Sequence, residues 1–326
     1  MLKNIKKTFQ ASNALSKYSI FLVLAVLFVV CALLNENFAS IDNLSNISRQ
    51  ITVGTILAFG ATLLIISGLI DLSSASVLAL SGVLSVDFYL HTESLFLALM
   101  VGILVGVVCN VINGVMVTYF KAPPFIATLA MMAMARGASL LYTNGQNIYQ
   151  IGNYVELGQG YFLGVPTPLW FLALILLLTG YILKHTKLGR SIYAIGGNEE
   201  AAIASGINVN AVKMQAYIIN GIFVGLAGVL FMSRVNGGMP NGAIGYEFKG
   251  LTAAVIGGTS FSGGIGTATG TLAGAFIVGF LDNIMVLTGV NSYLQQIVRG
   301  AIIALAVIYD IYAKKRRTKK VVDKVK

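Results

Sequence analysis

The sequence has few charged residues. Only 10% of its 326 residues are Asp, Glu, Lys or Arg, whereas 56% are hydrophobic and the mean hydropathy is +0.82. Because a water-soluble domain carries roughly 25% charged residues, this deficit excludes an ordinary soluble domain. Apolar runs such as 20–34 and 95–117 approach the roughly 20 residues that a membrane-spanning helix needs. The composition therefore predicts an all-α polytopic membrane protein.

Residues that carry catalytic chemistry are also scarce. There is no G-x-x-x-x-G-K-[ST] loop, so we expect that the chain does not hydrolyse ATP by itself. There is no H-E-x-x-H motif, and the only histidines are His91 and His185. Cys31 and Cys109 lie in apolar segments without disulfide or metal spacing, as packing residues do. We expect no catalytic residue, no metal site and no cofactor of its own.

The net charge of +10 is concentrated at the two ends of the chain. Clusters of this kind beside membrane segments stay on the cytoplasmic side and can contact anionic headgroups, so a nucleic-acid partner is not expected. The N-terminal basic and apolar segment has no convincing cleavage site, which predicts an uncleaved first helix. The clustered residues are Lys3, Lys6, Lys7, Lys17, Lys314, Lys315, Arg316, Arg317, Lys319 and Lys320.

The apolar segments predict about ten membrane spans. An even number of spans puts both termini on the cytoplasmic side, as the basic clusters require. The loop 143–167, which this topology places on the opposite side, contains no Lys or Arg. The predicted spans are 18–36, 50–69, 72–90, 95–119, 123–142, 168–184, 213–233, 250–264, 267–288 and 294–312.

Glycine is abundant, with 36 copies, and recurs at helical spacing. Small residues three or four positions apart line one helix face and let neighbouring backbones approach closely. We therefore predict tight helix packing along three stripes. These are Gly102, Gly106, Asn110 and Gly114; Gly221, Gly225 and Gly228; and Gly266, Gly270 and Gly274.

Two stretches are too polar for a lipid-exposed helix. They read "SGLIDLSSAS" (67–76) and "GGTSFSGGIG" (257–266). Irregular backbone at membrane depth is tolerated where it is buried in protein or lines a cavity, and broken segments often mark a transport path. Interfacial turns are the alternative for both stretches.

Polar residues inside predicted spans are the main candidates for function, because burying them is costly. Asn110 and Asn113 lie one turn apart on a glycine-striped span, so both should face the bundle interior. Two interpretations remain open: hydrogen bonds and ion pairs between helices, or a polar pathway for a hydroxyl-rich solute. The substrate-path candidates are Asp71, Asn110, Asn113, Arg136, Asn220, Asp282 and Asn283.

A polar insert, "YAIGGNEEAAIASGIN" (193–208), separates two apolar regions. It lacks G-x-G-x-x-G spacing and puts two glutamates where phosphates would lie, which excludes a nucleotide loop. Asn198 is a good N-cap, Glu199 and Glu200 suit the positive end of a helix dipole, and Gly206 suits a left-handed end. This pattern predicts a helix of about seven residues, too short to be stable alone. It should dock on a partner or on the chain's own loops.

Several long stretches closely resemble ribose-type sugar ABC importer permeases, of the branched-chain/monosaccharide permease superfamily. They are "LGRSIYAIGGNEEAAIASGINVNAVKMQAYIING", "KAPPFIATLAMMAMARGASLLYTNGQNI", "YEFKGLTAAVIGGTSFSGGIGTATGTLAGAFIVG" and "YLQQIVRGAIIALAVI", which span most of 50–310. The family usually shows a G-G-I-D-L-S-V-G-S-like pattern after the second span. Here Asp71, Leu72 and Ser73 remain, while Ser67 and Ala75 replace two glycines.

The resemblance implies a permease in a bacterial inner membrane that works with a cytoplasmic ATPase, which binds ATP and Mg²⁺, and with an extracytoplasmic sugar-binding protein. It also implies a second permease copy, with a homodimer expected. One transmembrane domain would cover 1–326, with cytoplasmic segments at 1–17, 185–212 and 313–326. The residues implied to couple with the ATPase are Gly196, Gly197, Asn198, Glu199, Glu200, Ala201, Ala202, Ser205 and Gly206.

Two other classes of function are compatible with the composition. An ion-coupled secondary transporter would use Asp71 or Asp282 as its titrating carboxylate and would stop working when a protonophore is added. A membrane scaffold or membrane enzyme lacks a recognisable catalytic constellation. Copurification of an ATPase separates these classes from an ABC importer.

Overall fold

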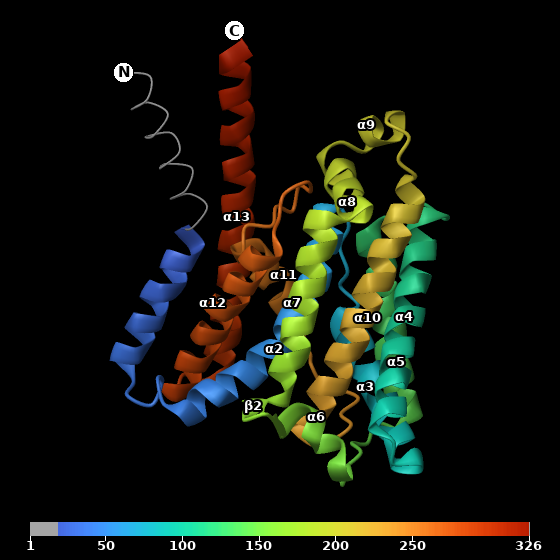
Figure 1. Ribbon diagram of the computed structural model, residues 1–326, viewed down its shortest axis with the longest axis vertical. Helices are drawn as coiled ribbons and strands as arrows, with labels where there is room; N and C mark the ends of the chain where they lie inside the picture. The colour runs from blue at the N-terminus through green and yellow to red at the C-terminus, as the bar shows by residue number, and fades with distance from the viewer. Residues whose placement is uncertain (1–18, 326) are drawn as a thin grey trace.

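The computed structural model describes residues 19–325, with the backbone alone for 309–311 and 313–325. The predicted cytoplasmic segment 1–17 lies outside the described residues. The chain forms a bundle of helices, and the one small sheet among the described residues is a two-stranded hairpin of β1 (Tyr161–Phe162) and β2 (Val165–Pro166). Figure 1 shows the helices packed side by side, with α8 (Lys187–Gly197) and α9 (Glu199–Ala204) at one end and β2 and α6 (Glu156–Gln159) at the other.

Within the described part of the chain, seven helices are long and apolar enough to cross a membrane. They agree with seven of the predicted spans within a few residues at most boundaries, although α2 begins earlier and α10 is longer than predicted. The seven are α2 (Ile41–Ile66), α3 (Ser74–Thr92), α4 (Leu95–Thr118), α5 (Pro124–Tyr142), α7 (Thr167–His185), α10 (Val209–Val235) and α12 (Ala268–Leu287).

The remaining three predicted spans are shorter or interrupted. The first and last match shorter apolar stretches, Ser19–Leu34 and Ser292–Ile308. The latter opens α13 (Ser292–Val325), which continues as helix through the segment predicted as a basic tail. The span predicted at 250–264 is wrong, because α11 (Tyr246–Ile256) has 11 residues and an irregular loop follows it. Hydropathy averages miss this break, which Gly258, Gly263 and Gly264 make by taking positive φ.

Close packing of glycine faces holds the centre of the bundle together, as predicted. A Cβ on Gly106 of α4 would strike the carbonyl of Gly221 on α10, and one on Gly225 would strike the carbonyl of Gly102. Gly228 meets α3 in the same way, at the carbonyl of Leu78, and also at the hydroxyl of Ser81. Such contact between backbones is possible only where the side chain is absent, so these glycines set the distances between α3, α4 and α10.

A second glycine contact joins α11 to α12. A Cβ on Gly270 would collide with the carbonyl of Gly257, and one on Gly274 with the carbonyl of Ala253. The ring of Phe280, on α12, packs edge-on against Phe38, which lies just before α2, with ring centroids 5.5 Å apart. These contacts make α11, α12 and the start of α2 one packed unit.

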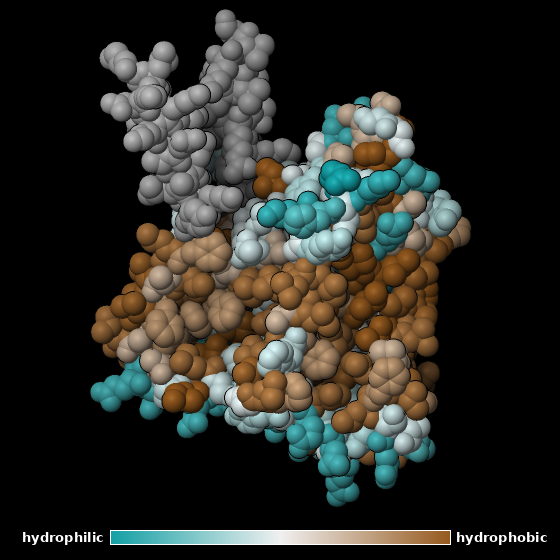
Figure 2. Space-filling model, in the orientation of Figure 1, coloured by the Kyte–Doolittle hydropathy of each residue, from teal (hydrophilic) through white to brown (hydrophobic). Residues whose placement is uncertain are grey.

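The surface has the pattern of a membrane protein. Figure 2 shows a hydrophobic band across the middle of this face, with hydrophilic residues above and below it. The lower end is closed by η1 (Gly152–Val155), α6 (Glu156–Gln159) and the small hairpin. Tyr154 is fully buried there, and its hydroxyl lies 2.9 Å from the hydroxyl of Ser85 on α3.

Candidate functional site

A buried polar cluster lies where the turn between α2 and α3 meets α4 and α10. Its centre is Asp71, which is 3% exposed. One carboxylate oxygen accepts from the amide and the hydroxyl of Ser73. The other accepts from Nδ2 of Asn220 at 2.7 Å and from the hydroxyl of Ser74 at 3.2 Å. Four donors therefore converge on one carboxylate, and none of them is a cation.

Two asparagines of α4 extend this cluster. Nδ2 of Asn220 also donates to Oδ1 of Asn110 at 2.8 Å, and Nδ2 of Asn113 donates to the hydroxyl of Ser73 at 3.0 Å. Both α4 asparagines are fully buried. The structure thus brings Asp71, Asn110, Asn113 and Asn220 together, and their hydrogen bonds join three helices and a turn.

Ser67 and Ala75, which lie on either side of this cluster, both have ordinary helical surroundings. Ser67 has an ordinary φ of −84°, and its hydroxyl donates to the carbonyls of Leu63 and Leu64 at the end of α2. Ala75 is buried inside α3. The positive φ that this turn requires falls at Gly68, at +76°, and that residue is still glycine.

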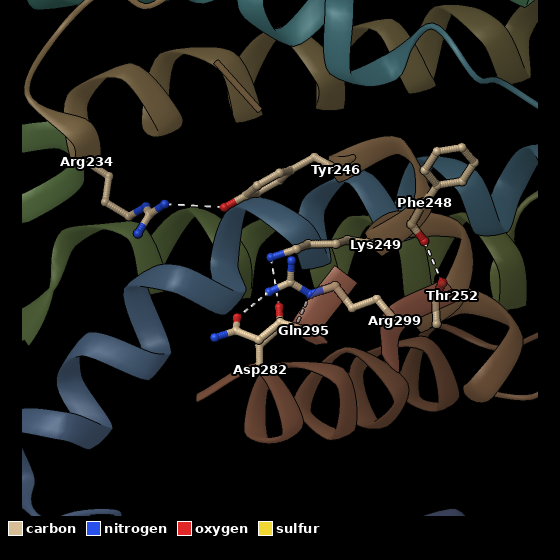
Figure 3. A network of polar contacts seen from close by, with 8 residues as sticks. All are labelled: Arg234, Tyr246, Phe248, Lys249, Thr252, Asp282, Gln295 and Arg299. Atoms are coloured by element: carbon tan, nitrogen blue, oxygen red, sulfur yellow. Dashed lines mark hydrogen bonds and ion pairs between the residues drawn. The ribbon is translucent and has the colours of Figure 1, made fainter. Parts of the chain in front are cut away.

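A second polar cluster surrounds Asp282 on α12. Lys249 of α11 approaches one of its carboxylate oxygens at 2.8 Å, and Nε of Arg299 on α13 donates to the other at 2.7 Å. Figure 3 shows both cations pointing at Asp282, with Gln295 accepting a further hydrogen bond from Arg299 at 3.2 Å. One carboxylate with two cations leaves the group with a net charge of +1.

The remaining path candidates lie apart from these clusters. Arg136 on α5 donates to the carbonyls of Pro240 and Gly242, in the loop before α11. Asn283 follows Asp282 along α12, yet its amide exchanges two hydrogen bonds with the amide of Asn43 at the start of α2, at 3.1 and 3.0 Å. Both residues hold loops and helix ends together.

A cavity of about 490 Å³ adjoins the Asp282 cluster, between α11, α12 and α13. Asp282, Lys249 and Arg299 all line it. The other lining residues are mostly apolar, and they include the aromatic ring of Phe248. Pockets of roughly 300–1,000 Å³ that combine apolar walls with a few polar groups are typical of small-molecule sites.

The polar insert forms a short helix, as predicted. It is α9 (Glu199–Ala204), of 6 residues, and the side chain of Asn198 caps it by accepting from the amide of Ala201 at 2.9 Å. Gly206 ends it with φ at +80°. Ala202 is buried, whereas Glu199, Glu200 and the 58% exposed Ile203 face outward.

The preceding helix, α8 (Lys187–Gly197), fastens α9 to the bundle. Gly196 lies so close to the carbonyl of Ile66, at the end of α2, that a Cβ would collide with it. The hydroxyl of Tyr193 donates to the carbonyl of Gly266 at 2.7 Å, in the loop between α11 and α12. Burial raises the pKa of this phenol, which therefore stays a neutral donor.

The same loop also contacts α2 directly. The amide of Gly264 donates to the carbonyl of Ile66 at 2.8 Å. Gly263 and Gly264, both at positive φ, pack against Gly196. The segment "GGTSFSGGIG" is therefore a turn that contacts α8, and a displacement of α8 would be felt by α11 and α12.

Three residues described above were not predicted as site residues from the sequence. They are Lys249 and Arg299, beside Asp282, and Tyr193, on α8. Arg299 lies inside the predicted span 294–312, so the criterion that selected Asp282 would also have found it. Lys249 lies just before the predicted span 250–264, so that criterion misses it. No sequence signal marks Tyr193, because its partner is a backbone carbonyl 73 positions away.

Comparisons with known proteins give consistent matches. The family profile described as "Branched-chain amino acid transport system / permease component" matches residues 43–307. The ribose import permease protein RbsC of Haemophilus influenzae is 39% identical over 317 residues, which cover 96% of this chain and 98% of that protein. The Escherichia coli K12 protein of that name is 41% identical over 296 residues, covering 89% and 92%.

A relative named for a different sugar is similar over a comparable length. The L-arabinose transport system permease protein AraH of Escherichia coli K12 is 35% identical over 313 residues, which cover 96% of this chain and 95% of that protein. No solved structure matches the chain.

Proposed function

The chain belongs to the branched-chain amino acid transport system / permease component family, and on this premise we propose that it is the permease subunit of an ATP-driven monosaccharide importer. Ribose and arabinose, the sugars in its relatives' names, are the first solutes to test. An extracytoplasmic binding protein would deliver the sugar. A separate ATPase subunit would bind ATP and Mg²⁺ and supply the energy, because the sequence has no P-loop.

The observation that carries this proposal is the exposed helix α9. Two glutamates and the apolar side chain of Ile203 face outward from it. A helix of this length is not stable by itself, and here it is held by its Asn198 cap and by buried Ala202. A rigid, exposed element that combines charge with an apolar side chain suits docking to another protein, which we propose is the ATPase.

The contacts of α8 support a route from the docked ATPase to the membrane region. Since α8 contacts the end of α2 and the loop between α11 and α12, movement of α9 would reach three helices at once. We propose that this movement alternates the access of the permease between the two sides of the membrane. A second permease copy would complete the path.

The proposal also assigns an orientation. The end of the molecule that carries α8 and α9 would face the cytoplasm of a bacterial cell, with both termini on that side. The positive-inside rule supports this, because Lys184, Lys187 and Arg190 flank the turn into α8. The end that carries the small hairpin would face the binding protein.

Charge reversal at Glu200 tests the docking surface. Glu200 is exposed and has no ion-pair partner among the side chains that the structure describes, so Glu200→Lys should leave the fold intact and reduce the copurifying ATPase at least fivefold. Glu36→Lys, an exposed acid near the other end, is the matched control. Equal ATPase recovery with both variants would refute docking at α9.

Uptake measurements test the importer itself. The permease, ATPase and binding protein, reconstituted in liposomes, should accumulate labelled ribose or arabinose only when ATP is supplied, and a protonophore should have no effect. Uptake that needs no ATP and stops with the protonophore would show an ion-coupled transporter instead.

A further inference from the structure

The cavity beside Asp282 has an unusual supply of hydrogen-bond donors. Lysine carries three N–H donors and arginine five. Lys249 and Arg299 each use one on Asp282, and Arg299 uses another on Gln295. Since each oxygen of Asp282 already holds one cation, the wall has more donors than acceptors.

These groups are also accessible to different degrees. The carboxylate is almost enclosed, with a side-chain exposure of 4%, whereas Lys249 is 18% and Arg299 32% exposed. All three groups line the cavity, and the two cations are the more accessible of them. A solute in the cavity would meet ammonium and guanidinium donors first.

The remaining wall suits the other faces of a sugar. Phe248, 48% exposed, offers an aromatic surface on the α11 side, and Met285 and Ile303 add apolar contacts. A monosaccharide combines hydroxyl edges with apolar C–H faces, so it matches a wall of N–H donors and an aromatic ring better than a cation would. The net charge of +1 also disfavours an inorganic cation, because like charges repel at short range in a medium of low dielectric constant.

We infer that this cavity binds the permeating solute during transport, and that Lys249 and Arg299 donate hydrogen bonds to the oxygens of a neutral polyhydroxylated molecule. The inference rests on the proposed importer function. Asp282 acts as a positioning residue, which keeps the two cations in place on α11 and α13. A merely structural ion cluster would instead stabilise the helices without affecting the passage of sugar.

Neutral replacements of comparable size test the role of the donors. In the reconstituted importer, Lys249→Met and Arg299→Met should each lower the rate of sugar uptake at least tenfold, while the ATP hydrolysis that the binding protein stimulates stays within twofold. Lys249→Arg, which keeps a cationic donor, should retain at least a third of the uptake. Unchanged uptake in both methionine variants would overturn the inference, and so would a parallel fall of uptake and hydrolysis.

A second measurement does not depend on removing any charge. In Met285→Cys the new thiol would line the cavity, whereas in Leu104→Cys it would lie on the 62% exposed lipid-facing side of α4. The native Cys31 and Cys109 are buried. A charged thiol reagent should label the Met285→Cys protein and reduce uptake at least fivefold, and it should spare the Leu104→Cys protein. Labelling without any loss of uptake would refute the inference.

The two proposals can fail separately. Wild-type liposomes that show no ATP-dependent uptake would refute the importer function. If wild-type liposomes take up sugar with ATP, and neither the methionine replacements nor the labelling reduces that uptake, the importer function stands and only the cavity is refuted as its solute site.

Discussion

Two aspartates, Asp71 and Asp282, lie almost equally buried in this bundle, but their partners differ in kind. Asp71 is surrounded by neutral donors, among them Ser73 and Asn220, and has no ion pair among the described residues. Asp282 is held by two cations and borders a cavity. One network is sealed within helix packing, and the other is open to a solute.

This difference in partners indicates that the Asp71 network stabilises the fold, whereas the Asp282 cluster can also bind a ligand. Neutral donors that converge on a carboxylate from a turn and from α10 leave little capacity for another ligand, so the Asp71 network fixes helix positions. The Asp282 cluster has surplus N–H donors and borders a cavity, so Lys249 and Arg299 can also donate to a solute. Burial alone does not distinguish them, since both aspartates are 3% exposed.

The largest expected effect is on stability at Asp71. Asp71→Ala removes the acceptor of several buried donors, each of which costs about 1–3 kcal/mol when left unpaired, so folded yield and Tm in detergent should fall sharply. Asp282→Ala, whose cationic partners are better exposed, is the comparison and should lower Tm less. Equal losses of Tm would remove the distinction between the two networks.

The next largest effect is on transport at Asp282. Asp282→Asn keeps the shape but leaves Lys249 and Arg299 without a compensating charge, so they should separate, and uptake should fall about tenfold while the ATPase still copurifies. Asn283→Ser, at the neighbouring residue that faces Asn43 instead of the cavity, should keep uptake within twofold. Comparable loss in both would mean that position along α12, rather than the cavity, matters.

Within the sealed network, Asn220 should matter more than Asn113. Nδ2 of Asn220 donates to both Asp71 and Asn110, whereas Asn113 makes one hydrogen bond and its buried Oδ1 has no partner among the described residues. We expect Asn220→Leu to cost about 2–3 kcal/mol and Asn113→Leu about 1 kcal/mol. The midpoint of unfolding in a mild denaturing detergent gives the ranking, and the reverse order would contradict the assigned hydrogen bonds.

The smallest effect is at the exposed end of the molecule. Glu199 pairs with Lys213 at 2.9 Å, but its side chain is 49% exposed, and such surface pairs contribute about 0–1 kcal/mol. Glu199→Gln should leave Tm unchanged within about 1 °C, because solvent screens the lost charge. A larger shift would show that this pair supports α9 in the isolated subunit. Lys213→Gln, made in parallel, should match it.

Features that depend on neighbouring residues could be predicted from the sequence. The cap at Asn198, the left-handed Gly206 and the seven long apolar helices are each set by a few adjacent side chains. The glycine stripes of α4 and α10 were predictable for the same reason, because helical periodicity places them on one face. Contact of the path candidates with a solute stays a prediction.

Features that depend on distant residues could not be predicted. Asp71 and Asn220 are 149 positions apart, and nothing local indicates that Asp71 meets amides whereas Asp282 meets cations. The end of α11 was missed at Ile256 because hydropathy measures apolar content and is blind to the backbone conformation of glycine. The contact of Gly196 with Ile66 and Gly264 also exists only after the helices have packed.

The sequence alone determined a membrane-embedded, all-helical chain with close-packed glycine faces and one capped polar helix, because hydropathy, helical period and capping act over a few residues. Only the tertiary structure decided which polar residues meet, which of them face a cavity, and that the loop before α12 touches the helix before α9. Those outcomes follow from how distant helices pack, since a buried donor pairs with whichever acceptor packing brings within about 3 Å.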